Sequence, residues 1–237
     1  MPDHREPVSR RARPAKSPLS RRSILDAAMT LIREHGVEAV SMRHVAEQVE
    51  TGPASLYAYF ESRDVLLEHV LDAVYGRVEL VELGALDWRE ALGGTITNTI
   101  ETLEFYPGLS AVALGTIPTL PGALRLAEHE LALMEAGGIA EDRAALAVDL
   151  IAQFAAVTAV ERTVRHDRAR GDGEREHVRT AYQNADPQLF PRVTRSAALL
   201  TGPDERARRD FTIRVIIAGI EQDPGDGSDR MRVRHAG

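Results

Sequence analysis

The chain contains no cysteine, which excludes a disulfide framework, a thiolate metal site and a thiol nucleophile. It has no run of about 18 apolar residues, so we expect no transmembrane span. Its first residues are charged and rich in proline, without the apolar stretch that marks a secretory signal. These absences predict a cytoplasmic protein that makes no membrane contact.

The 237 residues carry a formal net charge of −7, but this charge is unevenly distributed. Residues 1–22 hold seven Lys and Arg residues against two acidic ones, whereas the chain after residue 63 is strongly acidic. A cationic front on an anionic body favours nucleic acid as a partner, because only the front can displace counterions from phosphates. The same composition also suits a solvated leader, and we predict a disordered basic arm over residues 1–19.

Apolar residues recur at helical spacing along most of the chain and show no period of two. This pattern predicts an all-α fold without a sheet. The first helix is expected to begin after the N-cap residue Ser20 and to end at Gly36 in a left-handed turn. A short helix follows Ser41, and a third helix of about two turns runs from Pro53 through Phe60.

Longer helices are expected in the rest of the chain. One starts at Asp64 and extends to about residue 83, long enough to lead out of the first bundle. Further helices are predicted over residues 88–105, 109–116, 122–136, 140–165, 188–200 and 204–222. The polar, glycine-rich stretch 166–187 is predicted to be a loop, and the tail 223–237 to be disordered. The two domains expected from this division cover residues 20–66 and 67–222.

Residues 41–60 have the pattern of a helix-turn-helix, in which one side of the second helix stays free for the major groove. Met42, Val45, Ala46 and Val49 give the first helix an apolar side, and Leu56 and Phe60 supply that of the second. Its free side carries Pro53, Ala54, Ser55, Tyr57, Ala58 and Tyr59. A tyrosine offers DNA apolar area and one hydrogen bond, although both tyrosines also suit a half-buried place in the core.

Residues 19–70 resemble the DNA-binding domain of the tetracycline-repressor (TetR) family. The family pattern is matched with its spacing by Ala28, Leu31, Gly36, Ser41, Arg43, Val45, Ala46, Leu56, Tyr57, Tyr59, Phe60, Arg63, Leu66 and Leu67. Three features depart from the usual residues: Glu50, Tyr59, and the pair Pro53 and Ala54, which lack side-chain donors. Glu50 stands where the turn commonly has glycine, at a position often found with φ > 0. Tyr59 replaces the usual histidine.

The resemblance implies a set of DNA contacts. Arg43 would reach a phosphate or a base from the second helix, and Arg63 would take the place of a phosphate-binding lysine. Because proline and alanine offer no side-chain donor, base readout would depend on Ser55, Arg43 and DNA shape. The residues assigned to DNA are Arg43, Pro53, Ala54, Ser55, Tyr57, Tyr59 and Arg63.

The stretch from about Trp88 to Glu161 resembles the ligand domain of the tetracycline-repressor subgroup. Such proteins dimerise through a four-helix interface, built here from the long helix over residues 140–165 and the last long helix. Apolar residues on these helices either pack within the chain or, as the resemblance implies, form that interface: Leu150, Phe154, Phe211, Val215 and Ile216.

The subgroup binds a magnesium–tetracycline chelate through a metal-ligating histidine and a threonine in a Gly-Thr-x-Pro segment. Here the threonine is kept, as Thr116, but Ala113 stands at the metal-binding position, and a methyl group cannot ligate a metal. We therefore expect no metal and no other cofactor, and an apolar or multi-ring effector in place of tetracycline. Glu161 also suits an interface salt bridge. The pocket residues implied are Thr95, Thr99, Ala113, Thr116, Glu130 and Glu161.

The combined prediction is a ligand-responsive repressor that binds a palindromic operator as a homodimer. Effector binding would swing the helix that begins near Asp64 and release the DNA. An architectural or activating DNA-binding protein without an effector is the alternative, because it shares the first domain. A small helical enzyme is disfavoured: Glu68-His69 and Glu128-His129-Glu130 are the close acid–imidazole groups, and no catalytic motif accompanies them.

Overall fold

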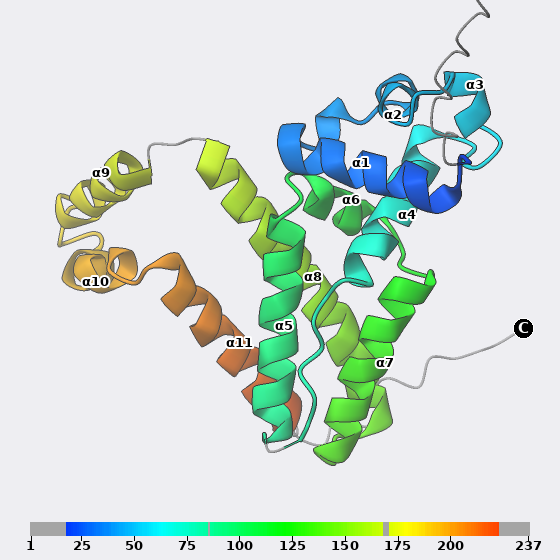
Figure 1. The fold of residues 1–237 in the computed structure, drawn as a ribbon. Coiled ribbons are helices and arrows are strands. Elements are labelled where there is room, and N and C mark those ends of the chain that lie inside the picture. The colour runs from blue at the N-terminus through cyan, green and yellow to red at the C-terminus, as the bar shows by residue number, and fades with distance from the viewer. Residues whose placement is uncertain (1–17, 85, 168–170, 223–237) are drawn as a thin grey trace, which may run out of the picture.

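The computed structural model describes residues 18–84, 86–167 and 171–222 (Figure 1). Within these ranges the chain forms eleven α-helices, one 3-10 helix and no strand, which confirms the all-α prediction. The helices are α1 (Arg21–His35), η1 (Val37–Ala39), α2 (Met42–Gln48), α3 (Pro53–Leu56), α4 (Arg63–Tyr75), α5 (Trp88–Glu104), α6 (Leu109–Gly115), α7 (Pro121–Ala136), α8 (Glu141–Asp167), α9 (Gly171–Gln183), α10 (Pro191–Thr201) and α11 (Glu205–Glu221). The predicted disorder of the arm and tail lies outside the described residues, apart from Pro18 and Leu19.

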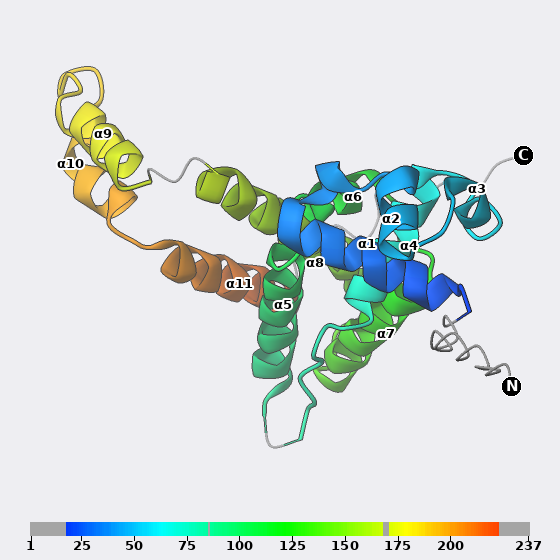
Figure 2. The same cartoon turned by 45° about the horizontal axis from the view of Figure 1, so that its top comes forward.

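Figures 1 and 2 show three parts of the molecule. Helices α1–α4 form an N-terminal bundle at one end, and α5–α8 form a body next to it. The pair α9–α10 stands away from both, connected through the ends of α8 and α11. Most helices of the body start and end within about three residues of their predicted bounds, because their capping residues and apolar spacing are clear in the sequence.

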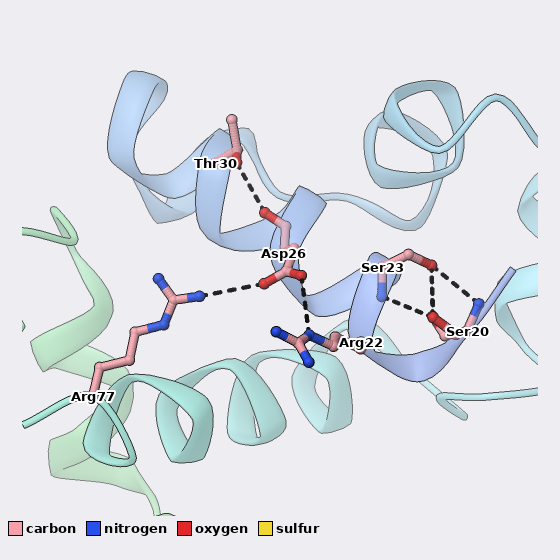
Figure 3. Close-up of polar contacts among 6 residues, drawn as sticks. All are labelled: Ser20, Arg22, Ser23, Asp26, Thr30 and Arg77. Atoms are coloured by element: carbon pink, nitrogen blue, oxygen red, sulfur yellow. Dashed lines mark hydrogen bonds and ion pairs between the residues drawn. The ribbon is translucent and has the colours of Figure 1, made fainter. Parts of the chain in front are cut away.

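The N-cap predicted for α1 is present as a capping box. Ser20 Oγ accepts the N–H of Ser23, and Ser23 Oγ accepts the N–H of Ser20 (Figure 3). At the other end, Gly36 has a positive φ of 78°, but its ψ of 169° is extended, so the predicted left-handed turn is wrong. The cause is the next residue: the Val37 N–H bonds to Pro107 O at 2.9 Å instead of returning to a carbonyl of α1.

Helix α4 ends at Tyr75, so its predicted extension to residue 83 is wrong. Residues 76–81 do not continue the helix, because side chains of α5 and α7 form hydrogen bonds with the backbone groups of this stretch. Asn98 and Arg125 donate to its carbonyls at 2.8 and 3.2 Å, and the Thr95 hydroxyl accepts from one of its N–H groups at 3.1 Å. These bonds replace the helical ones that the sequence pattern suggested.

One continuous hydrophobic core joins the N-terminal bundle to the body. Leu66, Val70 and Val74 of α4 are fully buried in it. The same cluster includes residues of α1–α3 on one side and Leu109 of α6 and Leu126 of α7 on the other. Helix α4 therefore belongs to both parts, and the predicted domain boundary after residue 66 falls within it.

Helix α8 has two apolar faces of different character. Its inner face is lined by small residues, which allow close packing against α5 and α6. These buried residues are Ala144, Ala147, Ile151, Ala155 and Ala159. Its outer face carries large residues that stay exposed, namely Leu146 at 63%, Leu150 at 49% and Val157 at 53%.

The apolar outer face of α8 also bears on the expectation of no membrane span. Among the described residues, the segment Glu141–Glu161 is long and apolar enough to cross a membrane by length and composition alone. The sequence prediction overlooked it because single polar residues interrupt the run. Since 33% of its most apolar window is buried against the rest of the protein, we interpret it as a packed helix with a second apolar face.

The predicted loop over residues 166–187 is wrong, because residues 171–183 form α9. Two glycines and a polar composition favoured a loop, but residues 174–183 contain no proline or glycine and are rich in helix formers. Helix α9 packs against α10, with Val178 half-buried and Arg179 Nε donating to the Thr201 hydroxyl at 3.3 Å. The partner helix supplies the stabilisation that a short isolated polar helix lacks.

Candidate DNA-binding surface and effector site

Helices α2 and α3 pack together through the residues predicted for a helix-turn-helix. Val45 and Ala46 of α2 and Leu56 of α3 are 0% exposed, and Phe60 is 1% exposed. The turn between them passes through Glu50 with φ 52°, so the expected positive φ at this position is confirmed. A non-glycine residue pays roughly 1–2 kcal/mol for this conformation, which the buried contacts on either side offset.

The second helix of the motif is shorter than predicted. α3 makes one turn, and the N–H groups of Tyr59 and Phe60 both bond to Leu56 O, at 2.9 and 3.0 Å, which tightens the chain into a turn. Four of the residues assigned to DNA lie exposed along this segment: Pro53, Ala54, Ser55 and Tyr57. Tyr57 is 54% exposed, so its phenol points into solvent and not into the core.

Tyr59 occupies a different environment from Tyr57. It is half-buried, and its hydroxyl donates to Leu19 O at 2.9 Å, which attaches the residue before α1 to the end of the α3 turn. Arg21 Nη1 reinforces this contact by donating to Tyr59 O at 3.0 Å. The geometry thus gives Tyr59 a positioning role within the bundle.

The two arginines assigned to DNA also differ. Arg43 lies on α2 with a side chain 79% exposed and a single intrahelical ion pair to Glu47 at 2.9 Å. Arg63, in contrast, donates to Val40 O at 2.6 Å and to Val37 O at 3.0 Å. These bonds hold the η1 turn against the start of α4, although the Arg63 side chain remains 38% exposed.

The η1 turn connects the N-terminal bundle to the α5–α6 turn of the body. Val37 bonds to Pro107 O through its N–H and to Arg63 through its carbonyl. Gly108 packs directly beneath it with φ 83°, and a Cβ there would come within 2.5 Å of the Val37 side chain. Only glycine satisfies both the backbone angle and the spacing at this position.

A second connection runs through Arg77, which follows α4. Its guanidinium donates to the Tyr106 hydroxyl of the body at 3.0 Å and to Asp26 of α1 at 3.3 Å. Figure 3 shows the Asp26 carboxylate between Arg22, one turn earlier on α1, and Arg77, in the turn that follows α4. These exposed ion pairs add little stability, but they fix how α1 is oriented on the body.

The effector residues implied by the resemblance fall into two groups. Thr95 and Thr99 of α5 are 0% and 2% exposed, and the Thr99 hydroxyl donates to Thr95 O at 2.9 Å. Ala113 lies half-buried on α6. Thr116 caps the end of α6 and lines a cavity of about 90 Å³ between α4 and the α6–α7 segment. This first group therefore lies within the body, near α4.

Glu161 lies elsewhere. It lines an open cavity of about 480 Å³ between α5, α8 and α11, together with Glu101 and Arg209. The Arg209 side chain is 8% exposed and pairs with Glu101 at 3.2 Å. The structure thus places Glu161 beside the outer faces of α8 and α11, away from the cavity that Thr116 lines.

The residues assigned to the dimer interface lie on these outer faces. Phe211 and Val215 of α11 are 61% and 53% exposed, while Phe154 and Ile216 are half-buried. Phe154 and Ile216 pack partly against the core of the body, whereas Leu150, Phe211 and Val215 leave apolar surface uncovered in the single chain, which is typical of a protein–protein interface. Leu146 and Val157 extend the same surface of α8, and their spacing from Leu150 could have identified them.

Family comparison agrees with this arrangement. The model for bacterial regulatory proteins of the tetR family matches residues 24–70, and the tetracyclin repressor-like C-terminal domain matches residues 82–223. The chain belongs to the tetR family. Its helix-turn-helix is therefore the DNA-binding part of a family of transcription regulators.

Individual relatives of this tetR-family chain were compared as well. It is 30% identical to the HTH-type transcriptional repressor DrrR1 of Streptomyces coeruleorubidus over 59% of this chain and 53% of that protein. It is 23% identical to the Escherichia coli tetracycline repressor protein class C, over 86% and 91%. The chain spans about half the length of the first curated relatives it matches.

Solved structures extend the likeness over most of the fold. Apo ActR from Streptomyces coelicolor superposes with a TM-score of 0.79 at 27% identity, covering 87% of this chain and 97% of that one. ActR in complex with actinorhodin gives the same TM-score. The whole arrangement of bundle and body is therefore shared with a tetR-family protein that binds a small molecule.

Proposed function

We propose that this tetR-family chain is a cytoplasmic, ligand-responsive repressor. It binds a palindromic operator as a homodimer and releases it when a small-molecule effector binds in the body. The observation that carries the proposal is the exposed segment Pro53–Tyr57, held outward by the buried Leu56 and Phe60. A surface presented in this way can lie in a major groove.

The homodimer is supported by the uncovered apolar faces of α8 and α11. Two copies that bury these faces against each other would carry two reading surfaces related by a two-fold axis, as a palindromic site requires. The residues proposed for the interface are Leu150, Phe154, Phe211, Val215 and Ile216.

An effector role is supported by the connections between body and bundle. Pro107 and Gly108, in the turn that precedes α6, contact Val37, and Val37 is held by Arg63 at the start of α4. A shift of α6 on effector binding would reach the reading surface through these contacts. Ala113 disfavours a magnesium–tetracycline chelate as that effector, because its methyl group cannot ligate the metal.

The enzyme alternative depends on two acid–imidazole groups, Glu68-His69 and Glu128-His129-Glu130. His69 Nε2 bonds to the Arg21 guanidinium at 3.0 Å, and burial, followed by the Arg21 charge, lowers the pKa of His69. His129 Nε2 bonds to Val81 O at 3.1 Å. Both imidazoles thus make structural contacts, and the relatives named above are transcription regulators.

The test is a mobility-shift titration with the DNA upstream of the protein's own gene. Tyr57→Ala should weaken binding about tenfold or more, because it removes an exposed contact of the reading segment. Tyr182→Ala, at an exposed tyrosine of α9, is the matched control and should leave affinity unchanged. Equal affinity of Tyr57→Ala and the unaltered protein would place the DNA surface elsewhere.

A further inference from the structure

Arg21, the first residue of α1, contacts both the α3 turn and α4 through its guanidinium. Nη1 donates to Tyr59 O at 3.0 Å, and Nη2 lies 3.0 Å from His69 Nε2 on α4. Cζ lies 4.5 Å from the centre of the buried Phe60 ring, within the range of a cation–π contact. One side chain therefore holds the start of α1, the end of the α3 turn and α4 together.

These contacts lie next to the exposed segment Pro53–Tyr57, called here the reading segment. Tyr59 follows it by two residues and has a second bond to the start of α1, because its hydroxyl donates to Leu19 O at 2.9 Å. The Tyr59 N–H bonds to Leu56 O at 2.9 Å, inside the reading segment. A change at Tyr59 O is therefore transmitted directly to the turn that presents Tyr57.

The contact between Arg21 and His69 requires a neutral imidazole. A guanidinium has five N–H donors, no acceptor, and a charge that it keeps in proteins. His69 Nε2 must therefore be the unprotonated nitrogen that accepts the bond, with the ring proton on Nδ1. The His69 ring also stands edge-on to Phe60, with centroids 5.3 Å apart, so a second contact orients it.

Charged groups face His69 from α1 and from its own helix. Arg21 is the cation, and Asp72 and Glu68 of α4 are the anions. Asp72 Oδ1 already accepts from two N–H groups at the start of α7, at 2.7 and 3.0 Å. His69 also lines the cavity of about 90 Å³, where the α6–α7 segment contributes no titratable side chain and burial raises the pKa of the Tyr75 phenol to about 12. Burial, followed by Arg21, lowers the pKa of His69 against the opposing effect of the two carboxylates.

We infer that His69 is a positioning residue for DNA binding: in its neutral form it holds the reading segment in place through Arg21. Protonation of the ring would remove the acceptor and leave two cations 3.0 Å apart, so Arg21 would withdraw from His69 and from Tyr59 O. The α3 turn would then lose one of its two bonds to the start of α1. This inference rests on the proposed reading segment, but the state of His69 can be measured without DNA.

Acidification should therefore weaken operator binding as His69 gains its proton. Because the pKa of His69 is lowered from 6.5, the contact is intact at pH 7.5 and is lost as the pH falls through the lowered value. Arg21 is exposed and His69 half-buried, so we expect a change of about two- to fivefold. The added positive charge of the whole protein strengthens DNA binding at low pH, so the effect has to be measured against a matched variant.

The first test measures the ratio of the operator Kd at pH 5.0 to that at pH 7.5, with a labelled fragment of the DNA upstream of the gene. His69→Gln keeps an acceptor near the position of Nε2 but cannot be protonated. Its ratio should be about two- to fivefold lower than that of the unaltered protein. His69→Lys, with a fixed charge, should bind more weakly than His69→Gln at both pH values. His35→Gln, at an exposed histidine in the last turn of α1, is the control and should keep the unaltered ratio.

The second test uses nuclear magnetic resonance of the full chain without DNA. Long-range ¹H–¹⁵N spectra should show the neutral His69 ring with its proton on Nδ1. Titration of this ring should shift the amide nitrogen of Phe60, which shares a peptide group with Tyr59 O. Arg21→Lys should abolish that shift, because an ammonium cannot contact the ring and both acceptors in the geometry of a guanidinium.

Two results would overturn the inference while leaving the proposed function intact. One is the same Kd ratio for His69→Gln and the unaltered protein. The other is a neutral His69 ring with its proton on Nε2, or a His69 titration that leaves the Phe60 amide unmoved. Absence of operator binding by the unaltered protein at pH 7.5 would instead reject the proposed function, and this inference with it.

Discussion

The N-terminal bundle buries its large apolar residues, whereas the outer faces of α8 and α11, called here the α8–α11 end, leave theirs exposed. In the bundle, Leu56 and Phe60 are 0% and 1% exposed. On the outer faces of α8 and α11, Leu146, Phe211 and Val215 are 63%, 61% and 53% exposed. The bundle thus completes its core with contacts from a single chain, whereas the α8–α11 end presents apolar surface that a second copy would cover.

This contrast predicts that charge introduced at the α8–α11 end breaks assembly and spares the fold. Leu150→Asp combined with Val215→Asp should convert the dimer to a monomer in sedimentation velocity. Operator affinity should fall by about 100-fold or more, because one chain then engages one half-site. Leu124→Asp, at a leucine 55% exposed on α7, is the control and should leave the dimer intact.

The comparison would fail in either of two ways. A dimer that persists in the double variant would mean that other residues hold the copies together. Loss of helical circular dichroism would mean that Leu150 and Val215 belong to the core of the single chain, as the bundle's Leu56 does.

Two arginines sharpen the comparison within the bundle itself. Arg63→Ala removes the donors to Val37 O and Val40 O and should lower the free energy of unfolding by about 2 kcal/mol, measured by urea denaturation. Arg43→Ala should change stability by less than about 0.5 kcal/mol, since its ion pair is exposed. It should instead reduce the salt dependence of operator binding by about one phosphate contact.

The opposite result would restore the role that the resemblance suggests for Arg63. If Arg63→Ala leaves stability unchanged and lowers the salt dependence, its guanidinium reaches phosphate in the complex and its carbonyl contacts are incidental. Arg63→Lys distinguishes the two cases further, because it keeps the charge but cannot bond to both carbonyls in the same geometry.

The sequence predicts some features of the structure better than others. Caps such as Ser20 and Ser41, and the positive φ at Glu50, follow from local chemistry and were predictable. The end of α4 and the helix α9 were not, because partners distant in sequence decide them. Side chains of α5 and α7 form hydrogen bonds with the backbone after Tyr75, and these bonds end α4 there. Helix α10 packs against the polar helix α9 and stabilises it, although its composition alone favours a loop.

The candidate site shows the same division. The exposure of Tyr57 and Arg43 follows from helical spacing in the helix-turn-helix. The bonds of Tyr59 and Arg63 to backbone carbonyls depend on how α1, η1 and α4 pack together. The spacing of apolar residues in the sequence does not predict this packing. Spacing places Glu130 on a helix but cannot show that burial raises its pKa to about 8.

Glu130, buried on α7 in the body, gives a prediction about pH. Its folded pKa of about 8 is raised above the ordinary 4.5, so the folded state binds the proton more tightly than the unfolded state does. The stability that this residue allows is therefore fully present below pH 4.5 and is lost as the pH rises through 8. Relative to Glu130→Gln, the unaltered protein should lose on the order of 3 kcal/mol between pH 5 and pH 8, seen as a lower Tm. Parallel Tm profiles for the two proteins would show that the carboxyl is hydrated in the folded state.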